Sequence, residues 1–232
     1  MSLLWEGLLA ALRLIVSGDP DVYHAAGVSL KVSCVAVAIA ACIGLPLSFA
    51  IATHEFRTKR AVVGLFNTLM SLPSVLAGLL LYALISRQGV LGPLDLLFTT
   101  KAMIIGQWIL SFPIVTALCI SAVQAIDPAV AKTAQALGAN RFQEALVVLR
   151  EARFALLAAL ATAFGRVIGE VGCAIMVGGN IRGYTRTMTT AIALETSKGE
   201  FNTAIGLAVL LLTITFLVNW GLTWIQQKGA KR

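Results

Sequence analysis

Residues 102–126 read AMIIGQWILSFPIVTALCISAVQAI, and this run contains no charged side chain. An α-helix rises about 1.5 Å per residue, so a helix formed by this run would be about 37 Å long. The hydrocarbon core of a bilayer is roughly 30 Å thick. Apolar and polar residues do not alternate along the run, as they would in a membrane strand. The run therefore predicts an α-helix that spans a membrane.

The composition of the whole chain agrees with this prediction. Of the 232 residues, 58% are hydrophobic and 12% are charged, which is about half the charged fraction of a soluble globular protein. A soluble domain of this size cannot cover so much apolar surface with a polar shell. The composition excludes an ordinary cytosolic enzyme, a disordered chain and a disulfide-stapled secreted module. We expect an all-α integral membrane protein.

Four other stretches are also long and apolar enough to cross a bilayer, which takes roughly 20 helical residues. The five predicted spans are residues 28–53, 62–85, 102–126, 154–177 and 201–225. A proline lies inside each of the first three spans and is predicted to kink the helix there; these prolines are Pro46, Pro73 and Pro113.

The N-terminal stretch, residues 2–17, is treated separately. Apolar residues recur in it at helical spacing, but Glu6 and Arg13 interrupt it, which favours an interfacial helix over a sixth span. The apolar residues are Leu4, Leu8, Leu12 and Ile15. The predicted organisation is an interfacial helix with an outer linker (1–27), a transmembrane domain (28–226) and a basic cytoplasmic tail (227–232).

Basic residues predict the orientation of the spans. One set of connecting segments holds ten of them: Arg57, Lys59, Arg60, Lys132, Arg141, Arg150, Arg153, Lys228, Lys231 and Arg232. The opposite set holds six: Arg13, Arg87, Lys101, Arg182, Arg186 and Lys198. Because the richer side faces the cytoplasm, we expect the N-terminus outside, the C-terminus inside and the loop 127–153 in the cytoplasm. The net charge of +7 is then a result of topology and does not indicate nucleic-acid binding.

The residues that usually carry catalysis or bind metals are few and scattered. The cysteines lie inside apolar stretches without metal-ligand spacing, and His24 and His54 are predicted on opposite sides of the membrane. The chain lacks a phosphate-binding loop that ends in Gly-Lys-Ser or Gly-Lys-Thr. We therefore expect no catalytic residue, no metal and no cofactor in this chain.

The loop 127–153 is predicted to form two short helices. Asp127 can cap the first helix and Pro128 can begin it. Gly138 can end this helix in a left-handed conformation, and Asn140 can cap a second helix whose apolar residues recur three to four apart. Two helices joined at a glycine would form a compact projection at the membrane surface.

This loop resembles the signature loop of the integral-membrane subunits of ABC importers. The family signature is a Glu-Ala-Ala triplet, a glycine four residues later and a following Leu-Pro. Here residues 132–134 occupy the triplet and 150–151 the Leu-Pro position, and only Ala134 and Gly138 match strictly. The resemblance implies that the loop docks in a groove of an ATP-binding subunit. The coupling residues that it implies are Lys132, Thr133, Ala134, Leu137, Gly138, Ala139, Arg141 and Phe142.

A second block, residues 164–199, is similar to the molybdate/sulfate/tungstate branch of these importers, and most of all to tungstate permeases. It contains the runs FGRVIGEVG (164–172), MVGGNI (176–181) and TRTMTTAI (185–192). The resemblance implies a type I ABC importer permease fold in a bacterial inner membrane, with a second copy of the chain in the pore. It also implies separate ATP-binding subunits that hold ATP and Mg²⁺, and an external or periplasmic oxyanion-binding protein. Tungstate is the implied substrate, with molybdate or sulfate as the alternatives.

Arg166 and Glu170 form an unusual charged pair in the fourth predicted span. An unpaired arginine near the bilayer centre costs roughly 2.5–3.5 kcal/mol, and a carboxylate four residues on can pair with it along one helix face. A stripe of small residues beside the pair would let another helix approach closely: Ala161, Gly165, Gly169 and Cys173. Either the pair lines the pathway and attracts a dianion, or it is a buried clamp. We favour the clamp.

The segment between the last two spans is rich in hydroxyl groups and cations, which suit an oxyanion with several acceptor oxygens. We predict an outer gate or docking surface there, formed by Gly178, Gly179, Asn180, Arg182, Arg186, Thr189 and Thr190. A polar loop without ligand contact is the alternative. At the level of the whole protein, a passive anion channel and a membrane-embedded enzyme also compete, but a channel gives the structured cytoplasmic loop no role.

Overall fold

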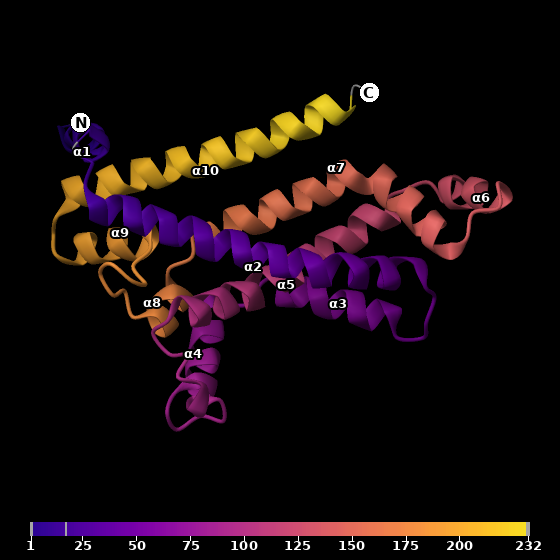
Figure 1. The fold of residues 1–232 in the computed structure, drawn as a ribbon, viewed down its shortest axis with the longest axis horizontal. Helices are drawn as coiled ribbons and strands as arrows, with labels where there is room; N and C mark the ends of the chain where they lie inside the picture. Colours follow the sequence, from indigo (N-terminus) through magenta and orange to yellow (C-terminus); the bar gives the residue numbers. More distant parts are fainter. Residues whose placement is uncertain (1, 17, 231–232) are drawn as a thin grey trace.

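The computed structural model describes residues 2–16 and 18–230 (Figure 1). The order of elements is α1 (Ser2–Val16), α2 (Pro20–Thr53), α3 (Lys59–Leu69), α4 (Ser74–Ile85), the 3-10 turn η1 (Gly92–Leu94), α5 (Thr100–Gln124), α6 (Pro128–Ala136), α7 (Arg141–Ile168), α8 (Gly172–Gly178), α9 (Met188–Ser197) and α10 (Phe201–Ala230). The described residues contain no strand. The prediction of an all-α fold is confirmed.

The core lies where α2, α5 and α7 pack together along the long axis of the molecule (Figure 1). Val32 of α2, Val115 of α5 and Val167 of α7 are completely buried. α2 and α5 approach closely at Gly44, where an added Cβ would lie 3.1 Å from Thr116 Oγ1. Small residues therefore allow the long apolar helices to pack tightly.

Three helices are long and apolar enough to cross a membrane alone: α2, α5 and residues 201–221 of α10. They correspond to the predicted spans 28–53, 102–126 and 201–225. Pro46 and Pro113 lie inside α2 and α5 without ending them. α2 begins at Pro20 and α10 continues to Ala230, so these helices also occupy parts of the predicted linker and tail.

The other two predicted spans, 62–85 and 154–177, are each broken into two helices; the first break lies at the kink predicted at Pro73, whereas no break was predicted in the second. α3 and α4 meet at 96°, and α7 and α8 meet at 61°. At the first break Pro73 has extended backbone and precedes the first residue of α4, because proline lacks an N–H group and disfavours helix in the residue before it. At the second break α7 ends at Gly169. A window of apolar residues does not register either break.

Two groups of connections lie at opposite ends of the bundle. The α2–α3 connection and α6 lie at one end, and α1 and α9 lie at the other (Figure 1). α1 is seen end-on in this view and crosses the start of α10, where Asn202 Nδ2 donates a hydrogen bond to Glu6 Oε2 at 3.2 Å. The side chains of Leu4, Leu8 and Ile15, which the predicted amphipathic pattern used, lie outside the described residues, as do residues 231–232.

Candidate functional site

The α6–α7 hairpin has the caps that the sequence predicted. Asp127 Oδ1 accepts a hydrogen bond from the Ala129 N–H at 2.8 Å, and Pro128 is the first residue of α6. Gly138 has a φ of +83°, which is the left-handed conformation expected where a helix ends. Asn140 caps α7 through a reciprocal pair of hydrogen bonds with Gln143. These local predictions are confirmed.

The second helix of the hairpin is not short, as the sequence reading expected. α7 continues for 28 residues from Arg141 to Ile168, so the second loop helix and the fourth span form one continuous helix. The reason is visible in the sequence, since residues 141–164 contain neither glycine nor proline to stop the helix.

The tip of the hairpin exposes two large apolar side chains. Leu137 is 84% exposed and Phe142 is 78% exposed, and they flank the Gly138 turn. Ala134 is buried against the rest of the hairpin, whereas Lys132, Thr133 and Arg141 are exposed. Ala139 donates its N–H to the Ala134 carbonyl at 3.0 Å and closes the turn. Exposed apolar residues on a rigid turn form a surface on which a partner can bury them.

Arg166 and Glu170 form the predicted ion pair, with 2.9 Å between Arg166 Nη1 and Glu170 Oε2. They do not share a helix face, because Glu170 lies past the end of α7, in the break before α8. Glu170 Oε1 also accepts from the Cys173 N–H at 3.2 Å, and its carbonyl accepts from Thr189 Oγ1 at 2.8 Å. The Glu170 side chain is 3% exposed and that of Arg166 is 45% exposed. Glu170 thus joins α7, α8 and α9 at the break.

The small-residue stripe beside this pair is packed against other helices at its Cys173 end and is less covered at Gly165 and Gly169. Cys173 is buried and packs against α4 and α5, next to Gly78 and Gly106. A Cβ on Gly165 would meet only Asn219 Nδ2, at 3.9 Å, and one on Gly169 would meet only the carbonyl oxygen of Gly165. Gly165 therefore lies beside α10, and among the described residues no second helix lies within 4 Å of a Cβ on Gly169.

The predicted outer surface at 178–190 is a compact segment, called the outer loop below, in which most polar groups form hydrogen bonds with one another. Asn180 Oδ1 accepts from Thr190 Oγ1 at 2.9 Å and from Arg186 Nε at 3.2 Å. Gly178, Thr189 and Thr190 are buried, whereas Gly179 is exposed and Asn180 and Arg186 are partly exposed. Gly179 and Asn180 both adopt positive φ, of 71° and 51°. The threonine hydroxyls thus stabilise the fold of the outer loop.

Arg182 is the most exposed cation of this segment and pairs with Asp21 at the start of α2. Arg182 Nε donates to Asp21 Oδ2 at 2.8 Å, and this hydrogen bond to the carboxylate raises the pKa of Arg182. The two residues are 161 positions apart, so no local sequence signal could have indicated the pair. This ion pair connects the outer loop to α2.

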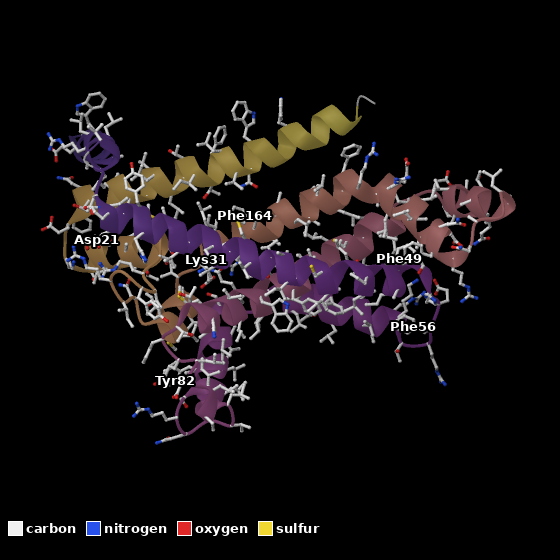
Figure 2. The ribbon with its side chains drawn as sticks, in the orientation of Figure 1. Asp21, Lys31, Phe49, Phe56, Tyr82 and Phe164 are labelled. Atoms are coloured by element: carbon white, nitrogen blue, oxygen red, sulfur yellow. The ribbon has the colours of Figure 1, made fainter. Side chains whose placement is uncertain are left out.

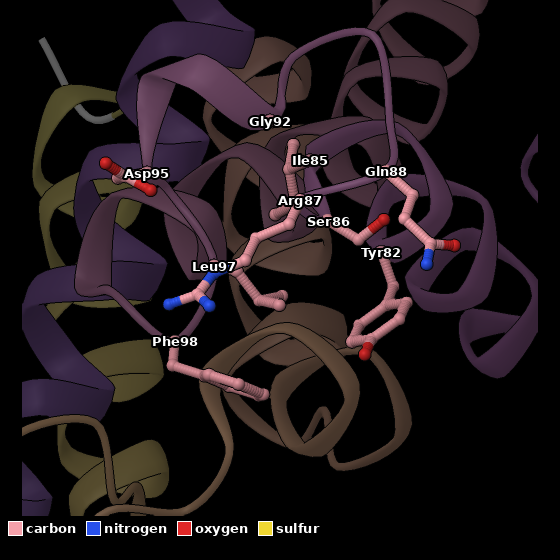
Figure 3. A pocket seen from close by; sticks show the side chains of 9 residues that line it. All are labelled: Tyr82, Ile85, Ser86, Arg87, Gln88, Gly92, Asp95, Leu97 and Phe98. Atoms are coloured by element: carbon pink, nitrogen blue, oxygen red, sulfur yellow. The ribbon is translucent and has the colours of Figure 1, made fainter.

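One hollow lies at the α9 end of the bundle and another at the end of the projecting helix α4. One, of about 270 Å³, lies between α1, α2, α9 and α10 and is lined by charges of both signs: Asp19, Asp21, Arg182, Arg186, Glu195 and Lys198. The other, of about 540 Å³, lies at the far end of α4 around Arg87 (Figure 3). Sequence reasoning counted Arg87 only as a topological charge. No group of three His, Cys, Asp or Glu within the described part of the chain is placed to hold a metal.

Comparison with known proteins places this architecture. Residues 44–230 match the family described as the binding-protein-dependent transport system inner membrane component. A tungstate uptake system permease protein, TupB, of Peptoclostridium acidaminophilum is 40% identical over 219 residues, covering 94% of this chain and 96% of that protein. A probable anion ABC transporter permease of Haloferax volcanii is 43% identical over 197 residues, covering 83% of this chain and 85% of that protein.

The fold also has a solved counterpart. A chain in the crystal structure of a bacterial alginate ABC transporter, in complex with a periplasmic protein bound to an alginate pentasaccharide, superposes with a TM-score of 0.77. The alignment covers 96% of this chain and 86% of that chain at 16% sequence identity. At that identity the likeness concerns the arrangement of helices.

Proposed function

The chain belongs to the binding-protein-dependent transport system inner membrane components, the permeases of ABC importers, and we propose that it carries tungstate into the cell. The observation that carries the choice of substrate is the 40% identity to a tungstate permease over 94% of the chain. Molybdate and sulfate are the alternatives, because they are tetrahedral dianions with the same set of acceptor oxygens. The function is transport, and the chain supplies the path through the membrane.

The α6–α7 hairpin is proposed as the contact with separate ATP-binding subunits, which hold ATP and Mg²⁺. Leu137 and Phe142 would be the apolar residues that a groove in the partner buries, with Lys132, Thr133 and Arg141 around them. The support is their exposure on a turn that Gly138 and the Asn140 cap hold rigid. Ala134 and Ala139 would act by shaping this turn.

The α6 end of the bundle is proposed to face the cytoplasm, and the α9 end to face outward. The support is the excess of Lys and Arg in the connections that gather at the α6 end. The N-terminus would then lie outside and the C-terminus inside the bacterial inner membrane. Single cysteines at Gln135 and Tyr184, in a cysteine-free background, should react with an impermeant reagent from opposite sides. Reaction from one side would refute this orientation.

The outer loop around Asn180, Arg182 and Arg186 is proposed to bind an external or periplasmic oxyanion-binding protein. Its buried threonine network fixes the shape of the surface, and the Arg182–Asp21 ion pair lies exposed on it. Gly178, Gly179, Thr189 and Thr190 would be scaffold residues of this surface. Two copies of the chain would form one pore.

Arg166 and Glu170 are proposed as a clamp that sets the angle between α7 and α8. The support is that Glu170 is buried and bonds to Arg166, to the first turn of α8 and to α9. A carboxylate at 2.9 Å neutralises the arginine, which then attracts a passing dianion weakly. The alternative is that the half-exposed Arg166 contacts the substrate.

The test is uptake of labelled tungstate by vesicles that contain the permease, its ATP-binding subunits and the external binding protein. We expect uptake only when ATP is enclosed on the side of the hairpin, with molybdate and sulfate competing less well. Uptake by the permease alone, down a gradient and without ATP, would instead establish a passive anion channel. A preference for sulfate or molybdate over tungstate would correct the substrate.

A further inference from the structure

The 270 Å³ hollow between α1, α2, α9 and α10 is lined by both acidic and basic side chains, and one of each sign lacks an ion-pair partner. The paired charges are Arg182 with Asp21 and Lys198 with Glu195. Among the residues that the structure describes, neither Asp19 nor Arg186 has an opposite charge within 4.0 Å. Both of these side chains are partly exposed. The hollow therefore offers one anionic and one cationic group to a ligand.

An apolar hollow of about 80 Å³ adjoins the charged one. The two share Leu14 of α1 and Val22 of α2 as lining residues. On α10, Thr203 lines the charged hollow, whereas Leu210 and Ile214 line the apolar one. Thr203 is close to the start of the membrane-spanning part of α10, and Leu210 and Ile214 lie further along it. The charged hollow is therefore at the bilayer surface, and the apolar hollow is at the depth of the lipid tails.

The helices that form the apolar hollow are open to the bilayer along most of their length. Only 17% of the apolar window of α10 and 28% of that of α2 is buried inside the chain. An apolar chain that begins in the hollow can therefore continue along both helices. A ligand that fits both hollows has a charged head and an apolar tail, as a phospholipid does.

The charges of the hollow select the kind of head group. The guanidinium group of Arg186 can donate charge-assisted hydrogen bonds to a phosphate. Asp19 Oδ1 accepts from the Asp21 N–H at 2.9 Å, and the carboxylate has further lone pairs for the three donors of a primary ammonium group. A glycerol head would leave Asp19 without a cation. A choline head has no N–H donor and is typically bound by aromatic side chains, which are not among the described residues that line this hollow.

We propose that the two hollows bind one phosphatidylethanolamine molecule, with its phosphate at Arg186, its ammonium group at Asp19 and an acyl chain between α2 and α10. Figure 1 shows α1 crossing the start of α10 beside α9, and Figure 2 labels Asp21 at the same end of the bundle. The bound lipid connects α1 and the outer loop to the two long helices. This site goes beyond the proposed function and does not depend on which anion is carried.

The test is native mass spectrometry of the complete complex in detergent, titrated with lipids that have identical acyl chains. The lipids are phosphatidylethanolamine, phosphatidylcholine and phosphatidylglycerol. We expect phosphatidylethanolamine to bind roughly tenfold more tightly than the other two, which is the effect of about one hydrogen bond to a charged group. Equal affinity for the three lipids, or tighter binding of phosphatidylglycerol, would overturn the proposal.

Two substitutions separate the contacts of the head group. Asp19→Asn removes the negative charge but keeps the cap of α2, because asparagine caps a helix as well as aspartate does. We expect it to abolish the preference for ethanolamine over choline. Arg186→Gln should weaken the binding of all three lipids by roughly tenfold, because each carries a phosphate. Arg186→Lys keeps the positive charge and should retain most of the binding.

Lys101→Gln is the matched control. Lys101 is an exposed cation in the first turn of α5, outside the hollow, so its loss should leave the affinity for phosphatidylethanolamine unchanged. If Asp19→Asn keeps the full preference for ethanolamine, the ammonium group is not bound at Asp19 and the proposal fails. A loss of affinity in Lys101→Gln as large as that in Arg186→Gln would show binding to surface charge in general, which would also overturn the site.

Discussion

The two broken spans differ in what covers the chain at the break. Between α7 and α8, the buried Glu170 accepts hydrogen bonds from Arg166 and from Cys173, and α9 covers its carbonyl. Between α3 and α4, a proline turns the chain by 96° and leaves a largely apolar face uncovered. One break is closed by polar contacts inside the chain, and the other leaves surface for another molecule. Substitutions should therefore destabilise the first break, whereas at exposed surfaces they should affect assembly.

The largest effect is expected for Glu170→Ala. It leaves the half-exposed Arg166 and the first turn of α8 without their carboxylate partner, and losing hydrogen bonds to a charged group costs about 1.5–3 kcal/mol. Denaturant unfolding of the detergent-solubilised permease measures the loss. Glu55→Gln is the control, because Glu55 also pairs with a residue four positions away but is 87% exposed, so a change below about 1 kcal/mol is expected. Equal losses of stability in the two variants would show that the contacts of Glu170 at the α7–α8 break stabilise the protein no more than an exposed ion pair does.

A smaller effect is expected for Gly138→Val at the hairpin tip. A side chain at a φ of +83° costs about 1–2 kcal/mol in the left-handed region, and the distorted turn should abolish ATPase stimulation while membrane insertion continues. Gly138→Asn is the matched control, because asparagine tolerates this conformation and should keep most of the stimulation. Full stimulation in Gly138→Val would remove the turn from coupling.

The double variant Arg166→Met with Glu170→Met tests whether this ion pair is a structural clamp or contacts the substrate. Replacing both members of a buried pair with apolar residues is often close to neutral, so the free energy of unfolding should change by about 1 kcal/mol or less. If the pair is a clamp, assembly and much of the tungstate uptake return relative to Glu170→Ala. Normal assembly without uptake would show that Arg166 meets the substrate.

The smallest change in stability is expected for Phe142→Ala. This side chain is 78% exposed, so the free energy of unfolding should change by no more than about 0.5 kcal/mol. Binding to the ATP-binding subunit should weaken by roughly tenfold or more, as expected for an aromatic anchor. A pull-down of the ATPase with the purified permease measures it. An unchanged affinity would show that Phe142 is not part of the contact.

The sequence predicted the features that depend on neighbouring residues. Apolar length identified α2, α5 and α10, and the caps at Asp127 and Asn140 follow from side chains that reach two or three positions along the chain. Pro73 indicated a kink in the second span but not a turn of 96°, and hydropathy, which is averaged over many residues, gave no sign of the break at residues 169–171. Proline alone gives no rule, since Pro46 and Pro113 lie in continuous helices whereas Pro73 starts a new one.

The candidate site was predicted less completely, for a similar reason. The spacing of Arg166 and Glu170 indicated an ion pair, but the helix end between them could not be read from spacing. The bond from Thr189 to the Glu170 carbonyl and the pair of Arg182 with Asp21 join residues 19 and 161 positions apart. Such contacts depend on the packing of whole helices, which no single stretch of sequence specifies.

The uninterrupted length of α7 has a mechanical consequence. Its 28 residues form a rod about 42 Å long, with the apolar hairpin tip at one end and the Arg166–Glu170 pair at the other. A tilt of about 10° around one end displaces the other end by about 7 Å for a rod of this length. Because buried residues along α7 pack against α2 and α5, a tilt of this rod would move those helices with it.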